Sequence, residues 1–232
     1  MLFGCSSKCQ DDVNLNLFIN GQRINKVSNC KYLGVIIDDA LNWEEHANFV
    51  YKKIIRFSSI IYKLRVIVPK CVLNKLYYAF INPHIVYGIE VYANASKVCL
   101  DKLIKANNKI LRIFMNKKLD TPNIDLYHSF NVLPIPLLHE MNLLQIVYKF
   151  NHLKHWLPEV FQEYYITNRS VHDHLTRNKL NLHYTTVNSN FGKRCSVFRA
   201  GQYWNNLPNN FKLESSFSVF KKNIKHFLLH RS

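Results

Sequence analysis

Hydrophobic and polar residues along the first 40 positions follow the two-residue period of β-strands. They alternate over 13–17, and Phe18-Ile19 then leads into Asn20-Gly21, a pair that favours a tight hairpin turn. A return strand is expected over 23–27, and the apolar segment 31–37 supplies another strand. We therefore predict an antiparallel sheet of about three strands, which needs a partner layer because so small a sheet is not stable alone.

After residue 40 the apolar spacing changes to steps of three and four, the period of an α-helix. This stripe predicts one long helix over 43–66, for which Asp38-Asp39 and Asn42 offer N-terminal caps. The side opposite the stripe carries three cations, Lys52, Arg56 and Lys63. For any one of them a solvated helix face is the simpler interpretation, and contact with a polyanion is the alternative.

Further stripes predict a mainly helical chain as far as the C-terminus. Pro69 starts a helix that Asn82-Pro83 interrupts, and the segment 84–92 is expected to form a helix packed on almost every side. The other predicted helices span 97–115, 123–130, 135–155, 191–204 and 216–229. Periodicity fades over 157–182, and 182–187 fits a short strand. The predicted fold class is α+β, mainly α.

The helix predicted over 97–115 carries the clearest candidate site. Opposite its apolar stripe stand four cations at steps of three, four and three, Lys102, Lys105, Lys109 and Arg112. Like charges at this spacing repel one another, and no acid lies between them. A polyanion is therefore favoured here over a merely solvated face.

The whole chain has the same excess of positive charge. Its 232 residues include 31 Lys and Arg against 15 Asp and Glu, a formal net charge of +16. Clustered cations bind a polyanion by displacing its condensed counterions, so nucleic acid is favoured over an anionic membrane or a merely basic surface. No segment has the ~18–20 consecutive apolar residues of a membrane span, so no membrane partner is expected.

The six cysteines are scattered through a chain that is large enough to fold without disulfides. The N-terminus lacks the basic and apolar regions of a secretory signal. Both features predict an intracellular protein, either nuclear or cytoplasmic.

Metal ligands are sparse in the sequence. Cys5 and Cys9 have no second ligand pair at zinc-finger spacing. The best remaining group is His172-Asp173-His174, with His183 and Cys195 downstream, and it is either a weak zinc candidate or a set of ordinary loop residues.

Two adjacent acid pairs, Asp11-Asp12 and Asp38-Asp39, resemble the carboxylates of a metal-dependent enzyme. Two-metal catalysis needs carboxylates that converge from different elements, and helix capping accounts for Asp38-Asp39. The sequence has no Gly-rich phosphate loop or activated-nucleophile motif. We therefore predict no catalytic residue, metal ligand or cofactor in this chain.

Short motifs follow one another along almost the whole chain. They are Met1-Leu2-Phe3, Asn20-Gly21, Lys31-Tyr32-Leu33-Gly34-Val35, Leu41-Asn42-Trp43, Leu76-Tyr77, Pro83, Tyr87-Gly88, Asn108-Lys109-Ile110-Leu111-Arg112, Thr121-Pro122, Leu133-Pro134, Thr176-Arg177, Gly192-Lys193, Trp204-Asn205-Asn206-Leu207-Pro208 and Phe220-Lys221. In this order the chain resembles the C-terminal part of the reverse transcriptase of non-LTR (LINE-like, jockey-type) retrotransposons, with Asn107 where that family usually has Gln. Each motif alone is weak, and their succession carries the resemblance.

The resemblance implies three parts: a palm end with the primer-grip hairpin (1–40), a helical thumb (41–118) and a helical C-terminal region (119–232). The primer grip would comprise Lys31, Tyr32, Leu33 and Gly34. The thumb would hold an RNA/DNA template–primer duplex. The cations carried over for this contact are Lys52, Arg56, Lys105, Lys109 and Arg112, and Lys63 and Lys102 extend the same helix faces.

The parts of the family that perform the chemistry are not in this sequence. The fingers and the palm, with the motif-A aspartate and the Asp-Asp of the catalytic hairpin, would precede Met1. Because metal-assisted nucleotidyl transfer needs those carboxylates, we expect no polymerase activity from this chain, and Mg²⁺ only in the full-length enzyme. The expected residual role is template–primer binding. The alternatives are a non-catalytic helical interaction module and a non-functional transposon remnant whose reading frame starts at an internal Met.

Overall fold

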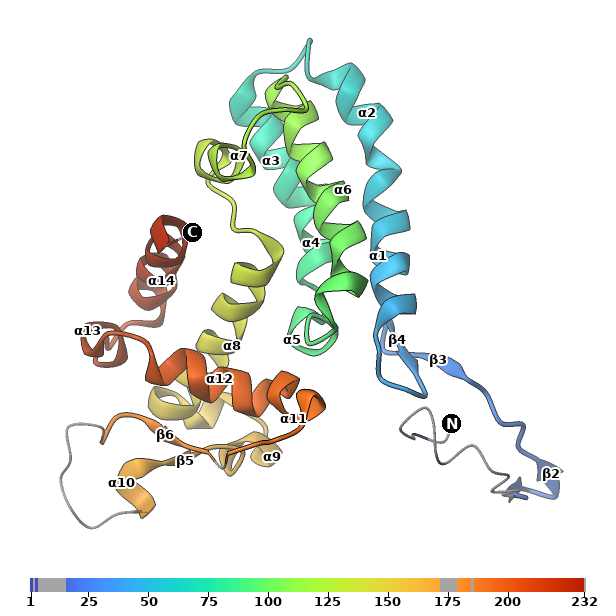
Figure 1. Ribbon diagram of the computed structural model, residues 1–232, viewed down its shortest axis with the longest axis vertical. Coiled ribbons are helices and arrows are strands. Elements are labelled where there is room, and N and C mark those ends of the chain that lie inside the picture. The colour runs from blue at the N-terminus through green and yellow to red at the C-terminus, as the bar shows by residue number, and fades with distance from the viewer. Residues whose placement is uncertain (2, 4–15, 172–178, 185, 232) are drawn as a thin grey trace.

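The computed structural model describes residues 1, 3, 16–171, 179–184 and 186–231. Over these residues helices predominate, and the strands form three two-stranded antiparallel sheets (Figure 1). The predicted class, α+β and mainly α, is therefore confirmed. In Figure 1 an upright group of helices that includes α1 and α6 occupies the top, the N-terminal hairpins lie at the lower right, and the C-terminal helices lie at the lower left.

The first β-hairpin joins β1 (Phe18–Ile19) to β2 (Gln22–Arg23). Asn20 and Gly21 form its turn with φ angles of 50° and 75°, which confirms the turn predicted from Asn-Gly. The return strand is shorter than the predicted 23–27. Most of the predicted alternation over 13–17 lies outside the described residues.

The second hairpin joins β3 (Asn29–Tyr32) to β4 (Val35–Asp38). Leu33 and Gly34 make its turn at φ angles of 45° and 83°. The prediction of one continuous strand over 31–37 in a three-stranded sheet is therefore wrong. Leucine rarely adopts positive φ, so the sequence gives little sign of a turn at this position.

Helices α1 (Glu44–Ile55) and α2 (Phe57–Leu64) replace the single helix predicted over 43–66. The serines after the junction explain the interruption. Ser58 Oγ donates to the Ile55 carbonyl at 2.7 Å, and Ser59 Oγ donates to the Arg56 carbonyl at 3.5 Å. Serine hydroxyls bonded back to the preceding turn compete with the helical ladder and bend helices.

Four helices follow α2 and complete the upright group in Figure 1. They are α3 (Lys70–Phe80), α4 (Asn82–Val86), α5 (Ile89–Tyr92) and α6 (Lys97–Met115). The prediction for 97–115 is confirmed, and the single helix predicted over 84–92 is wrong. The helix breaks there because Tyr87 is extended (φ −62°, ψ 112°) and Gly88 has φ 70°, a value that suits glycine.

The rest of the described chain is also mainly helical. Its helices are α7 (Asn123–Phe130), α8 (Ile135–His152), the 3₁₀ turn η1 (Lys154–Trp156), α9 (Glu159–Gln162), α10 (Asn168–Val171), α11 (Asn190–Arg194), α12 (Ser196–Asn205), α13 (Asn209–Lys212) and α14 (Phe217–Arg231). Strand β5 (Ile166–Thr167) pairs with β6 (Leu182–His183), which is shorter than the strand predicted over 182–187. The helix predicted over 191–204 is divided, because Cys195 is extended with ψ 136°.

One cluster of buried hydrophobic side chains runs through the helices, from Ala47 on α1 to Leu229 on α14. Within it, the Tyr77 ring makes edge contacts with Phe114 and Phe130, at centroid distances of 6.1 and 5.5 Å. Rings from α3, α6 and α7 therefore share one core. The division of the chain at residues 40 and 118 stays a prediction.

Candidate nucleic-acid interface

The cations of α6 stand on a rigid helix. Ser96 caps its N-terminus by accepting a hydrogen bond from Cys99 N at 3.4 Å, and Asn116 ends it in the left-handed conformation. The opposite side of the helix is buried in the core. Lys102, Lys105 and Lys109 are exposed along the outer edge, as the spacing predicted.

Each of these lysines is only lightly engaged. Lys105 pairs with Asp101 at 2.6 Å, but both side chains are exposed, 74% and 53%, and such surface pairs contribute little free energy. Lys102 Nζ lies 3.3 Å from Asn48 Oδ1 on α1. The cations are thus available to a partner that offers stronger acceptors.

Lys102 also shows how α6 and α1 combine. Its Nζ lies 4.8 Å from the centroid of the Tyr51 ring, so this side chain crosses from α6 to α1. Lys52 is exposed on α1 one turn beyond Asn48. The structure therefore places Lys102 of α6 against the same part of α1 that carries Lys52, although the two lysines are fifty residues apart in the sequence.

The other predicted cations differ in their surroundings. Arg56 is exposed at the junction of α1 and α2, and Lys63 is exposed on α2. Arg112 is half-buried and donates hydrogen bonds to the Thr121 carbonyl at 3.0 Å and to Asn123 Oδ1 at 2.7 Å. Arg112 therefore holds the linker before α7 in place, a role that its position in the basic row did not indicate.

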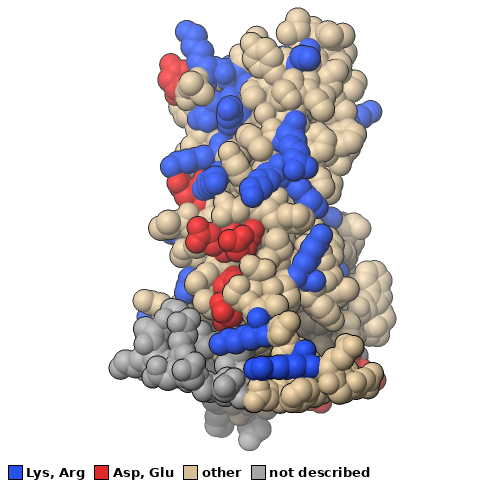
Figure 2. All heavy atoms as spheres, turned by 90° about the vertical axis from the view of Figure 1, so that its right-hand side faces the viewer, with Lys and Arg blue, Asp and Glu red and all other residues tan. Residues whose placement is uncertain are grey.

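Figure 2 shows the face that includes α1 and the hairpins. Lys and Arg side chains are most numerous over the upper half of this face, further ones lie towards its lower end, and acidic side chains gather in a smaller group near its middle. Glu44 and Glu45 form the first turn of α1, at the end nearer the hairpins. Positive charge consequently increases from the start of α1 towards α2.

The predicted primer-grip residues lie on the β3–β4 hairpin at the base of α1. Tyr32 and Leu33 are exposed, and the Leu33 carbonyl accepts a hydrogen bond from the Tyr87 hydroxyl at 2.5 Å. A Cβ at Gly34 would lie 3.1 Å from the Tyr87 ring, and one at Gly88 would lie 3.0 Å from Val35. Both glycines therefore allow the hairpin turn to pack closely on the junction of α4 and α5.

His46 joins the same hairpin to α1. Its Nδ1 accepts a hydrogen bond from Ile36 N on β4 at 3.2 Å, and the imidazole is buried. Burial, with a smaller contribution from the nearby Lys53 charge, lowers the pKa of His46 to about 4. The ring is therefore neutral at pH 7 and serves as an uncharged link between the helix and the hairpin.

Sequence patterns alone did not indicate Lys53 and His84. Both line a cavity of about 360 Å³ next to the hairpin, together with Lys31. Lys53 lies 22 residues from Lys31, and no pattern in the sequence pairs them. Only the packing of the hairpin on α1 and α4 reveals their proximity.

Among the described residues, no group of three His, Cys, Asp or Glu side chains is placed to hold a metal ion. The candidates Cys5, Cys9 and His172-Asp173-His174 lie outside the part of the chain that the structure describes. Within that part, every helix is either too short or too polar to cross a membrane.

Comparisons of the chain with models of protein families, with curated proteins and with solved structures find no match. The case for a function therefore rests on the residues themselves.

Proposed function

We propose that this chain is the C-terminal part of the RNA-directed DNA polymerase of a non-LTR retrotransposon, and that it binds an RNA/DNA template–primer duplex inside the cell, in the nucleus or cytoplasm. One observation carries the binding role: α1 and α6 both carry exposed lysines, and Lys102 joins the two helices through its contacts with Asn48 and Tyr51. The motif order along the sequence supports the origin.

Binding of this kind addresses the phosphate backbone. Lysines on rigid helices neutralise phosphates and release counterions, and they read no base edges. If Lys52, Lys102, Lys105 and Lys109 each neutralise one phosphate, affinity falls about 100-fold between 50 and 200 mM salt. Fluorescence anisotropy with a labelled hybrid duplex measures this dependence, and binding that does not change with salt would contradict the proposal.

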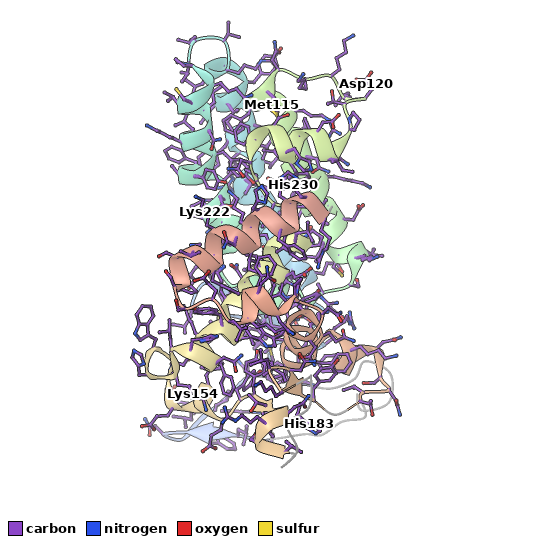
Figure 3. All side chains as sticks on the ribbon, turned by 90° about the vertical axis from the view of Figure 1, so that its left-hand side faces the viewer. Met115, Asp120, Lys154, His183, Lys222 and His230 are labelled. Carbon is purple, nitrogen blue, oxygen red and sulfur yellow. The ribbon has the colours of Figure 1, made fainter. Side chains whose placement is uncertain are left out.

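Charge-reversal variants test whether duplex binding depends on this surface or only on the net positive charge of the chain. The double variant Lys105→Glu/Lys109→Glu should weaken duplex binding at least about tenfold, equally for unrelated duplex sequences. Lys221→Glu/Lys222→Glu is a matched control, because it reverses two exposed lysines of α14 on the other side of the molecule, where Figure 3 labels Lys222. Equal losses in both variants would show that only net charge matters, and a changed sequence preference would indicate base readout.

We expect no primer extension by this chain alone with Mg²⁺ or Mn²⁺, because the catalytic carboxylates of the family are not in its sequence. A primer-extension assay on the purified chain tests this directly. Extension would contradict the assignment of the chain to the region beyond the catalytic palm.

A second candidate is a protein-interaction module. Phe18 and Ile19 on the first hairpin are 61% and 63% exposed, and exposed apolar residues of this kind mark contact surfaces. In a full-length polymerase their partner would be the palm. The ratio of nucleic-acid absorbance to protein absorbance in the purified chain distinguishes the two candidates. Nucleic acid that co-purifies with the chain supports duplex binding, and its absence at low salt supports the protein contact.

A further inference from the structure

A cavity of about 360 Å³ lies between the β3–β4 turn, α1 and α4. The hairpin contributes Lys31 and Gly34, α1 contributes His46 and Lys53, and α4 contributes His84. Tyr87 closes one side, where its hydroxyl is bonded to the Leu33 carbonyl. The cavity is thus built from three elements that the fold holds together.

Its charged and polar lining consists of cations and hydrogen-bond donors. Lys31 and Lys53 both line the cavity, and their Nζ atoms lie 5.2 and 4.5 Å from the centroid of the same ring, Phe49. Neither forms an ion pair with any residue that the structure describes. Two unpaired positive charges on the wall of one cavity favour an anion within it.

The histidines add donors without adding charge. Burial, followed by the Lys53 charge, lowers the pKa of both His46 and His84, so their rings are neutral at pH 7. Because His46 Nδ1 accepts the Ile36 N–H, the hydrogen of the neutral ring is on Nε2. That buried Nε2 has no partner in the described structure, so an N–H remains unpaired beside the cavity.

We propose that this cavity binds a phosphate group between Lys31 and Lys53, with His84 as a further donor. A phosphate has several strong acceptor oxygens, which suit a cavity lined by cations and N–H groups. The group is either part of a nucleic-acid strand, in which case the inference rests on the proposed function, or a free phosphate. Lys53, which lines the cavity, follows Lys52 of the proposed duplex-binding surface on α1.

Two measurements on the full chain test the proposal. The first titrates inorganic phosphate while the His84 ring protons are followed by NMR, with chloride at matched ionic strength as the reference. Phosphate should shift the His84 signals, and the shift should be lost in Lys53→Gln. The second measures duplex binding by anisotropy for Lys53→Gln and for the control Lys221→Gln, with circular dichroism confirming that both variants are folded.

The outcomes separate the two sources of phosphate. A His84 shift together with duplex binding weakened about tenfold in Lys53→Gln supports a strand phosphate. A His84 shift with unchanged duplex binding supports a free phosphate. Absence of a phosphate-specific shift overturns the cavity site, even if Lys53→Gln weakens duplex binding, since Lys53 then acts from the surface. If the wild-type chain binds no duplex, the proposed function fails, and the phosphate titration still decides whether the cavity binds phosphate.

Discussion

The phenolic hydroxyl of Tyr77 on α3 donates a hydrogen bond to Asn107 Oδ1 on α6 at 3.0 Å, and each of the two residues is only 1% exposed. Tyr77→Phe removes the donor and leaves the amide oxygen buried without it. We expect the free energy of unfolding to fall by about 1–3 kcal/mol, the cost of an unsatisfied buried polar group. Urea unfolding followed by circular dichroism measures this difference.

The adjacent tyrosine provides the control. The Tyr78 hydroxyl donates to the Asn131 carbonyl at 3.0 Å, but the side chain is exposed, so water replaces the lost partner in Tyr78→Phe. This variant should lose at most about 1 kcal/mol. Equal losses in the free energy of unfolding for both variants would mean that the buried hydrogen bond between α3 and α6 stabilises the fold no more than the exposed one.

Asp38 is predicted to stabilise the start of α1. Its carboxylate accepts hydrogen bonds from Asn42 N and Trp43 N, both at 2.8 Å, and Trp43 has a φ of 63°, which is unfavourable for a bulky residue. Asp38→Ala should lower the free energy of unfolding by about 1–2 kcal/mol. Asp39→Ala is the control, because the Asp39 contact with Ser28 uses the backbone N–H. A similar loss in both variants would refute the capping role.

Stability should fall in acid because of buried histidines. Burial lowers the pKa of His46 and His139 to about 4, compared with a usual value near 6.5. Between these values the unfolded chain binds protons that the folded chain does not. Above about pH 6.5 both histidines are neutral in the folded and the unfolded chain, and the free energy of unfolding is not reduced by them. As the pH falls towards 4, each histidine lowers the free energy of unfolding, by about 3 kcal/mol at most.

The variant His139→Gln tests this prediction, measured by urea unfolding between pH 7 and 4. Its free energy of unfolding should decrease less steeply with acid than that of the wild type. Burial raises the pKa of Glu90, which acts in the opposite direction, so the comparison with the wild type isolates the histidine. Parallel pH profiles would show that His139 is not buried in neutral form.

An ion pair joins the C-terminal helix α14 to α8. Arg231 on α14 donates to Glu140 Oε2 on α8 at 2.6 Å, and the Glu140 side chain is only 6% exposed. Arg231→Ala leaves that carboxylate buried and unpaired. Since Arg231 is 44% exposed, we expect a loss of about 1–2 kcal/mol, less than for a fully buried pair. Amide hydrogen exchange in α14 should be faster in Arg231→Ala than in the wild type. The control Lys222→Ala should leave it unchanged.

The long elements could be predicted from the sequence because their signals are local. The helix over 97–115 has a regular stripe and a Ser96 cap, and Asn20-Gly21 specifies its turn through the conformations that these residues tolerate. The missed breaks depend on finer features. Ser58 bonds back to Ile55, and Leu33 takes a positive φ that the hairpin imposes on it.

The candidate site was predictable only in part, for a related reason. Spacing identified Lys102, Lys105 and Lys109 as exposed cations on one helix. It could not reveal that Arg112 is bonded to Thr121 and Asn123, or that Lys31 and Lys53 both contact the Phe49 ring. Such contacts depend on how separate elements pack, and helical periodicity contains no information about that.

The close fit of Gly34 against Tyr87 bears on how the N-terminal region moves. The β3–β4 hairpin is joined to α1 through Ile36 and His46, and to the junction of α4 and α5 through Tyr87. These contacts attach the second hairpin to the helices, so we expect the two to move as one body. Limited proteolysis within 24–28 should accordingly release the first hairpin and leave the second one attached to the helical body.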